Sequence, residues 1–276
     1  MYRRMECPAR RDPTLTHHFL SRYNFFSVNK TPVSSTEGSR GNNMANPREI
    51  EVYVAGATKE VVIRVAPGFT KATGIEVVPV YDTVGKLRDR VLQGEKPGVA
   101  MLSSAALDTL QGKGLLAAGS RLNLGSVAIA LAIKRGATIP DISTPEALKK
   151  ALLGARSISH ADPEHGATAG THFSKVLDQL GIRPLIADRL VVMPFGVEVI
   201  QAVAEARVEL GVSQSSEISL HPGVSLVGGL PEPYTLVTPY GAASLDETDE
   251  NAKRFVDFLR TEAGADALSR AGFSAA

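Results

Sequence analysis

The chain has 276 residues, of which 43% are apolar and 21% charged, and its formal net charge is +1. This balance is that of a folded globular protein and excludes a strongly basic nucleic-acid binder. Its single cysteine, Cys7, excludes an intrachain disulfide and a cysteine-rich zinc site. No apolar run in the sequence approaches the roughly 18 residues of a membrane-spanning helix, so we expect no membrane insertion.

Residues 1–48 differ in composition from the rest of the chain. They combine arginines with Ser, Thr and Asn clusters and show little apolar periodicity, which predicts a disordered N-terminal extension. The early arginines are not followed by the apolar stretch of about 7–15 residues that a secretory signal needs. The sequence as it stands therefore predicts a cytoplasmic protein. If its start is misassigned, a periplasmic location is expected instead.

From residue 50 onward the hydrophobic pattern alternates between strands and helices. In the first half it predicts strands over 51–55, 75–81, 99–102 and 127–134, with helices over 59–72, 85–93 and 105–112. Thr144 followed by Pro145 is typical of a helix start, with Thr144 as the N-cap. In the second half it predicts strands over 157–159, 190–193, 210–212, 224–227 and 235–238, with helices over 171–180, 197–206, 249–261 and 263–270. Such alternation predicts parallel sheets covered by helices, the α/β class.

Most of these strands run directly into small polar residues and then into a helix. Helix N-termini carry unpaired N–H groups and a positive dipole end, and Gly, Ser and Thr beside them let an anion approach. Ligands of open α/β sheets bind at the carboxyl ends of the strands. The turns together therefore predict a small-anion site, although each Ser or Thr taken alone is better explained as a helix cap.

No P-loop, GxGxxG or HExxH signature occurs, so we expect neither a metal nor a cofactor. His165 lies in a polar loop over 160–170 and is a weak candidate for a catalytic base. Tyr240 is interpreted as a core or hinge residue. Tyr81 precedes a polar turn, where it could line a cleft or serve only as a strand residue.

Three segments of the sequence resemble the type II periplasmic solute-binding proteins, in particular their molybdate-binding branch. They are the stretch from "VYVAGATKEVV" to "GFTKATG", the run "LNLGSVAIALAIK" and the closing "AKRFVDFLRTEAGADALSRAGF". The resemblance covers about 49–273. It implies two α/β lobes joined by two crossover strands around a central ligand cleft, with lobe one formed by 49–126 plus 235–276 and lobe two by 127–234. Ligand binding in this family closes the lobes by a hinge motion.

The strand ends and the resemblance together assign seven residues to the cleft. They are Thr58, Thr83, Ser103, His165, Thr168, Gly196 and Gln214. A tyrosine that molybdate binders carry is replaced here by the stretch around Gln214, and Gln214 and His165 suit a carboxylate better than a tetrahedral oxyanion.

The resemblance implies two alternative functions. The first is a binding protein for a small anion, either an oxyanion such as molybdate or a di- or tricarboxylate, which would serve an ABC-type permease as its partner. The alternative is a cofactor-independent isomerase similar to aconitate isomerase, a relative in the wider family. Such an enzyme shifts a proton along an allylic system and needs a base next to the carbon acid.

Overall fold

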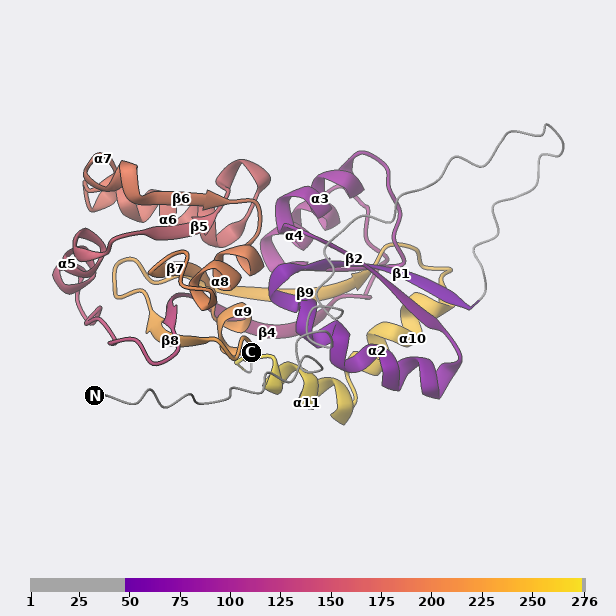
Figure 1. Cartoon of the computed structure of the whole chain (residues 1–276). Helices are drawn as coiled ribbons and strands as arrows, with labels where there is room; N and C mark the ends of the chain where they lie inside the picture. Colours follow the sequence, from indigo (N-terminus) through magenta and orange to yellow (C-terminus); the bar gives the residue numbers. More distant parts are fainter. Residues whose placement is uncertain (1–47, 275–276) are drawn as a thin grey trace, which may run out of the picture. The chain divides into compact units, whose positions relative to one another are not determined.

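The computed structural model of the protein describes residues 48–274 (Figure 1). The prediction of disorder for 1–48 therefore falls outside the described residues, except at Arg48. None of the helices in the described part is long and apolar enough to cross a membrane.

The first sheet is built from the N-terminal strands of the described chain. Strand β1 (Glu49–Ala55) pairs in parallel with β2 (Glu76–Asp82) on one side and with β3 (Val99–Ser103) on the other. The three strands lead into helices α2 (Lys59–Thr73), α3 (Val84–Leu92) and α4 (Ser104–Gly112), the first through the short 3-10 turn η1 (Gly56–Thr58). The strand–helix alternation read from the sequence is therefore present, with boundaries that differ by one or two residues.

Two strands link this sheet to a second one. The long strand β4 (Leu122–Lys134) pairs with β9 (Val237–Ser244) through its first half and with β7 (Leu210–Gln214) and β8 (Val224–Gly229) through its second half. The predicted strand over 127–134 was too short, because Gly125 has a φ of +96° at a shift in the pairing register and interrupts the apolar alternation. The predicted strand over 235–238 was also misplaced, since β9 extends to Ser244.

The second sheet has the strand order β4-β7-β5-β6, where β5 (Ile158–Ala161) pairs in parallel with β6 (Leu190–Met193) and with β7. Its helices are α5 (Pro145–Gly154), α6 (Thr168–Gln179) and α8 (Gly196–Ala204). Thr144 caps α5 as predicted, accepting a hydrogen bond from the Ala147 amide at 3.1 Å. The sequence analysis missed α7 (Arg183–Ile186) and α9 (Ser215–Ser219), because four or five residues are too few to show a helical period.

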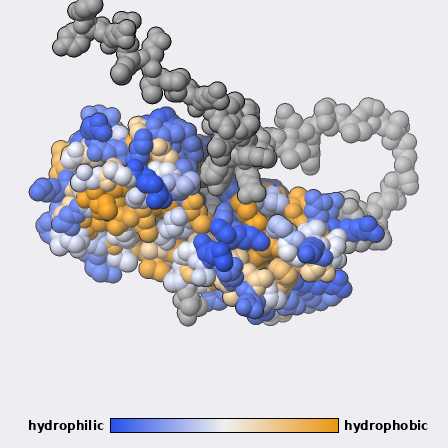
Figure 2. Space-filling view, turned by 60° about the horizontal axis from the view of Figure 1, so that its bottom comes forward, coloured by the Kyte–Doolittle hydropathy of each residue, from blue (hydrophilic) through white to orange (hydrophobic). Residues whose placement is uncertain are grey.

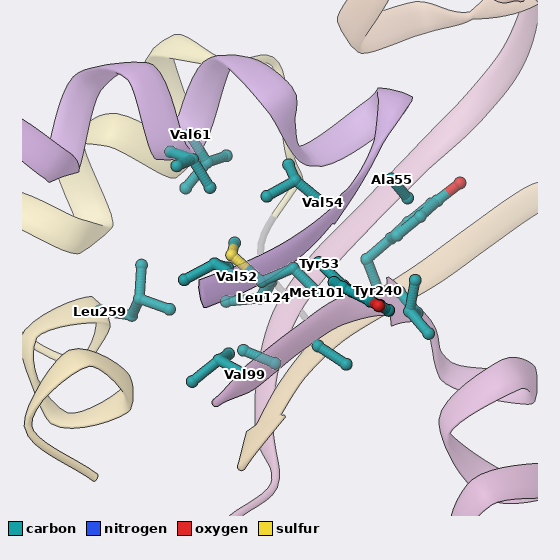
Figure 3. Close-up of a cluster of buried hydrophobic side chains, with 14 of the residues drawn as sticks. Val52, Tyr53, Val54, Ala55, Val61, Val99, Met101, Leu124, Tyr240 and Leu259 are labelled. Carbon is teal, nitrogen blue, oxygen red and sulfur yellow. The ribbon is translucent and has the colours of Figure 1, made fainter. Parts of the chain in front are cut away.

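Each sheet has a hydrophobic core of its own. The core of the first sheet contains side chains of β1 and β3 together with α2 and two C-terminal helices, α10 (Glu250–Leu259) and α11 (Glu262–Arg270) (Figure 3). In it, Phe69 lies edge-to-face against Phe255, with ring centroids 5.2 Å apart. Two further clusters of buried residues belong to the second sheet. The result is the predicted α/β architecture of two packed bodies joined by crossover strands.

Some apolar side chains also reach the surface, among them Val192, Leu226 and Val237. Figure 2 shows hydrophobic areas interspersed with hydrophilic ones on one face of the molecule. Exposed apolar residues of this kind are ordinary in folded proteins. We therefore sought the functional site among the polar groups at the strand ends.

Candidate functional site

The carboxyl ends of the strands in the two sheets meet. The amide of Gly85, in the first turn of α3, donates to the carbonyl of Gly166 at 3.2 Å, and the Thr83 hydroxyl donates to the carbonyl of His165. Gly166 follows the short 3-10 turn η2 (Pro163–His165) after β5. Two of the turns that the sequence singled out therefore come from different sheets and contact each other.

The carboxyl group of Glu217 is enclosed between turns that belong to the two sheets. Glu217 belongs to α9, directly after β7, and its Oε2 accepts a hydrogen bond from the hydroxyl of Ser213. The main-chain amide of Gln214 also donates to the carboxylate. A Cβ added to Gly56 would lie 2.4 Å from Oε1, and one added to Gly196 would lie 2.4 Å from Oε2. The carboxyl therefore lies against both the turn after β1 and the start of α8, and a side chain at either glycine would require it to shift.

The surroundings of Glu217 change its protonation. Burial of the carboxyl raises its pKa, although the hydrogen bonds from Ser213 and Gln214 and the positive charge of Lys59 act in the opposite direction. The residue as a whole is half-buried, but its carboxyl group is enclosed between the two main-chain segments. A buried carboxyl with a raised pKa is a candidate for proton transfer.

Lys59, the first residue of α2, supplies a positive charge to the same region. Burial lowers the pKa of Lys59, while the charges of Glu217 and Glu60 raise it. The Lys59 Nζ lies 5.0 Å from the centroid of the Tyr81 ring, a distance at which a cation is attracted by the aromatic face. Burial, with a contribution from Glu60, raises the pKa of Tyr81 to about 12, so that its hydroxyl stays protonated at neutral pH.

Tyr240, Gln214 and Thr168 form a buried polar network near Glu217. The hydroxyl of Tyr240, on β9, accepts a hydrogen bond from Gln214 Nε2 at 3.2 Å and is also bonded to the side chain of Thr168, at the start of α6. Burial raises the pKa of Tyr240, and the charge of Glu217 adds to this effect. Gln214 is only 4% exposed, and its Oε1 has no hydrogen-bond partner among the described residues. The network ties β9 to the second sheet beside the carboxyl.

The seven residues predicted from the sequence fall into two groups. Gly196, Gln214 and Thr168 lie around Glu217 and Tyr240. The other four have different neighbours. The buried Thr58 hydroxyl donates to the carbonyls of Ala55 and Met101, at 2.9 and 3.3 Å.

The remaining three lie at helix starts or at the contact between the turns. Thr83 and Ser103 cap α3 and α4, and Thr83 also contacts the loop of His165. His165 points to solvent, with 45% of its side chain exposed and its Nδ1 2.6 Å from Asp162 Oδ2.

Sequence reasoning missed Lys59 and Glu217, and it interpreted Tyr240 as a packing residue. Lys59 had one weak signal, because it is the first residue after the Gly-Ala-Thr turn that ends β1. Glu217 had a similar one, since it follows the polar run that ends β7. Among the described residues there is no group of three or more His, Cys, Asp or Glu side chains that could hold a metal ion.

Comparison with known protein families identifies the family of this chain. The family described as "Bacterial extracellular solute-binding protein" matches residues 50–274. The chain belongs to this family. The resemblance to type II solute-binding proteins seen in the sequence is thereby confirmed.

The chain is also similar to individual proteins of known function or structure. The chain is 29% identical to an aconitate isomerase from a Pseudomonas species over 234 residues, which cover 81% of this chain and 86% of that one. Its fold is similar to that of the periplasmic molybdate-binding protein of Azotobacter vinelandii, with a TM-score of 0.65, 20% identity and coverage of 82% and 99%.

A tungstate ABC transporter protein of Geobacter sulfurreducens gives a TM-score of 0.60 with 15% identity, covering 80% of this chain and 97% of that one. At these identities the two structures establish the two-lobed fold alone.

Proposed function

We propose that this solute-binding protein binds a small di- or tricarboxylate in its cleft and isomerises it by an allylic proton shift, as an aconitate isomerase does. The observation that carries the proposal is the Glu217 carboxyl enclosed between turns of the two sheets, with the positive charge of Lys59 acting on it. A cation next to a carboxyl of raised pKa provides charge stabilisation and proton transfer in one place.

The same pairing favours a polycarboxylate over a compact oxyanion. All of the charge on a tetrahedral oxyanion lies within one small group, so the nearby carboxylate of Glu217 would repel it. A tricarboxylate spreads its charges over a carbon skeleton. One carboxylate can therefore lie at Lys59 and the N-terminal amides of α2 or α8, while a methylene group lies at the acid or base. The 29% identity to an aconitate isomerase supports the same choice.

The chemistry needs no cofactor. A base removes a proton from the methylene carbon of aconitate, and the electron pair delocalises through the double bond onto a carboxylate as a dienolate. Lys59 and helix N-terminal amides would stabilise the charge that develops. The proton then returns to the carbon that began as the vinylic CH, so the double bond moves and no atom is gained or lost.

A second candidate is binding without turnover, in which the protein delivers the anion to an ABC-type permease. Membership of the solute-binding family favours it, and the same cleft would serve. That role would require the protein to reach the outer side of the membrane in which the permease lies.

The experiment is a proton NMR time course in D2O with trans-aconitate in large excess, combined with calorimetric titration. We expect the cis isomer to appear and the methylene signal to be lost to deuterium. Lys59→Met should weaken aconitate binding by about thirtyfold or more, as expected for removal of one partner of a desolvated charge pair. Lys71→Met, at the exposed end of the same helix, is the matched control and should bind like the wild type.

The outcomes separate the two candidates. Aconitate that binds but stays unchanged over hours would refute the isomerase and leave the carboxylate-binding protein. Tight binding of molybdate or tungstate without any binding of aconitate would refute the carboxylate site itself.

A further inference from the structure

We propose that Glu217 is the catalytic base that carries the proton between the two carbons of the substrate. This inference rests on the proposed isomerisation and assigns it to one side chain. Neither the sequence pattern nor the family membership points to this residue, which lies in a five-residue helix.

The first argument is the position of the carboxyl. Its two oxygens face main chain from different halves of the protein, with Oε1 against Gly56 of η1 and Oε2 against Gly196 of α8. Any side chain at either glycine would displace the carboxyl, since even a Cβ would come within 2.4 Å. The carboxyl therefore lies between the two halves of the protein, where we propose that the substrate binds.

The second argument is orientation. Ser213, which is fully buried, donates its hydroxyl hydrogen bond to Oε2, and the Gln214 amide holds the same carboxyl group. Two donors from the end of β7 thus fix the plane of the carboxylate before substrate arrives. We assign Oε1, the oxygen that faces Gly56, to proton transfer.

The third argument is basicity. An ordinary glutamate is a weak base at neutral pH, and a base works best when its pKa approaches the pH of the reaction. Burial shifts the pKa of Glu217 in that direction. The charged and titratable groups around it are Lys59 from α2 and Tyr240 from β9, and neither is suited to act as the base. Lys59 offers a positive charge to the substrate, and the hydroxyl of Tyr240 stays protonated.

The histidines that the sequence offered have other roles in the structure. The imidazole of His165 points to solvent and is bonded to Asp162. His160 is 1% exposed, packs its ring against Phe173 at 5.7 Å, and places Nδ1 2.8 Å from the Ala161 carbonyl oxygen. We therefore assign the proton transfer to Glu217 in place of His165.

The test compares Glu217→Gln with Glu60→Gln and His165→Ala by the NMR assay and by calorimetric binding of aconitate. Glu60 is a suitable control because it lies next to Lys59 but forms an ion pair with Arg64 at 2.8 Å. Glu217→Gln should lower both the isomerisation rate and the deuterium exchange by about 10²–10⁴-fold, the usual contribution of a positioned base. It should still bind aconitate, and the two control variants should turn over like the wild type.

A second variant distinguishes loss of the base from misfolding of the protein. Glu217→Asp keeps a carboxyl but withdraws it from Gly56, so we expect a partial loss of rate. The isomerisation rate of the wild type should increase with pH in a range above the ordinary glutamate pKa, because the base must be ionised. We call this increase the basic limb of the pH profile. That limb should be absent from any residual rate of Glu217→Gln.

Three results would overturn the assignment. If the wild type isomerises aconitate and Glu217→Gln keeps its rate, Glu217 is not the base, although the proposed function stands. If His165→Ala abolishes deuterium exchange while Glu217→Gln does not, the base is His165. If the wild type binds aconitate without turnover, the isomerase proposal fails and this assignment fails with it.

Discussion

The contact between Gly85 and Gly166 offers a direct test of whether ligand affinity depends on closure. Gly85 is the second residue of α3, and an added Cβ there would lie 2.8 Å from the Gly166 Cα. Its φ is not in the left-handed region, so alanine fits the local backbone. Alanine is also favoured over glycine within a helix, by up to about 1 kcal/mol. Gly85→Ala should therefore disturb the contact between the two halves and leave α3 intact.

The size of the effect follows from the geometry. Carbon atoms pack best at about 3.5–4.0 Å, so the turns must separate by about 1 Å to accommodate the new methyl group. This separation would break the 3.2 Å bond from the Gly85 amide and the Thr83–His165 bond. Two hydrogen bonds contribute about 1–3 kcal/mol together, so the closed state should weaken by that amount. Ligand affinity should fall by about 5- to 150-fold.

The assay is calorimetric titration of aconitate, with thermal unfolding of the unliganded protein measured in parallel. Gly112→Ala is the matched control, because Gly112 also lies in a helix and an added Cβ would have no neighbour within 4 Å. We expect Gly85→Ala to lose affinity without a fall in melting temperature and Gly112→Ala to bind normally. Wild-type affinity in Gly85→Ala would refute the reasoning, because it would mean that the closed contact contributes nothing to binding.

Three further predictions concern stability. Glu217→Gln should be more stable than the wild type at pH 8 but not at pH 4, measured by urea unfolding. Because the pKa of Glu217 is raised in the folded state, ionising this carboxyl destabilises the folded protein. The destabilisation is absent below the ordinary pKa of 4.5 and complete above the pKa that Glu217 has in the folded protein. A stability advantage of Glu217→Gln that does not depend on pH would contradict this. Phe69→Ala should lower the free energy of unfolding by about 3–5 kcal/mol, because the fully buried ring packs against Phe255 and Phe258. A loss below about 1 kcal/mol would contradict the packing of this core. Thr144→Ala should cost about 1 kcal/mol by removing the cap of α5, and Thr144→Ser should restore most of it; equal stability of all three proteins would show that the cap is dispensable.

Local features of the protein could be predicted from the sequence because they are encoded in neighbouring residues. The 3–4 residue spacing of Val61, Val62, Val65 and Phe69 predicted α2, and all four side chains are buried. The polar turns after the strands could be placed for the same reason, since a strand end and a helix cap are contiguous in the chain.

The candidate site could be predicted only in part. Gly196 and Gln214 were predicted because they follow strands, and both lie near Glu217. Thr58 follows a strand as well, but its hydroxyl is bonded to main-chain carbonyls. A strand-end position therefore narrows the choice of residues without telling which side chain faces the ligand.

The chain alone determined the α/β alternation, the helix caps and the family, all of which depend on short-range patterns or on the order of segments. The tertiary structure decided that β4 continues through the left-handed Gly125 into both sheets, and that the charges of Lys59 and Glu217 act on each other. These two residues are far apart in sequence and belong to different helices, one of them too short to have a period. The Glu217 carboxyl lies where two glycines, Gly56 and Gly196, let the main chains of both halves approach it. That approach depends on the packing of the two sheets, which no local pattern records.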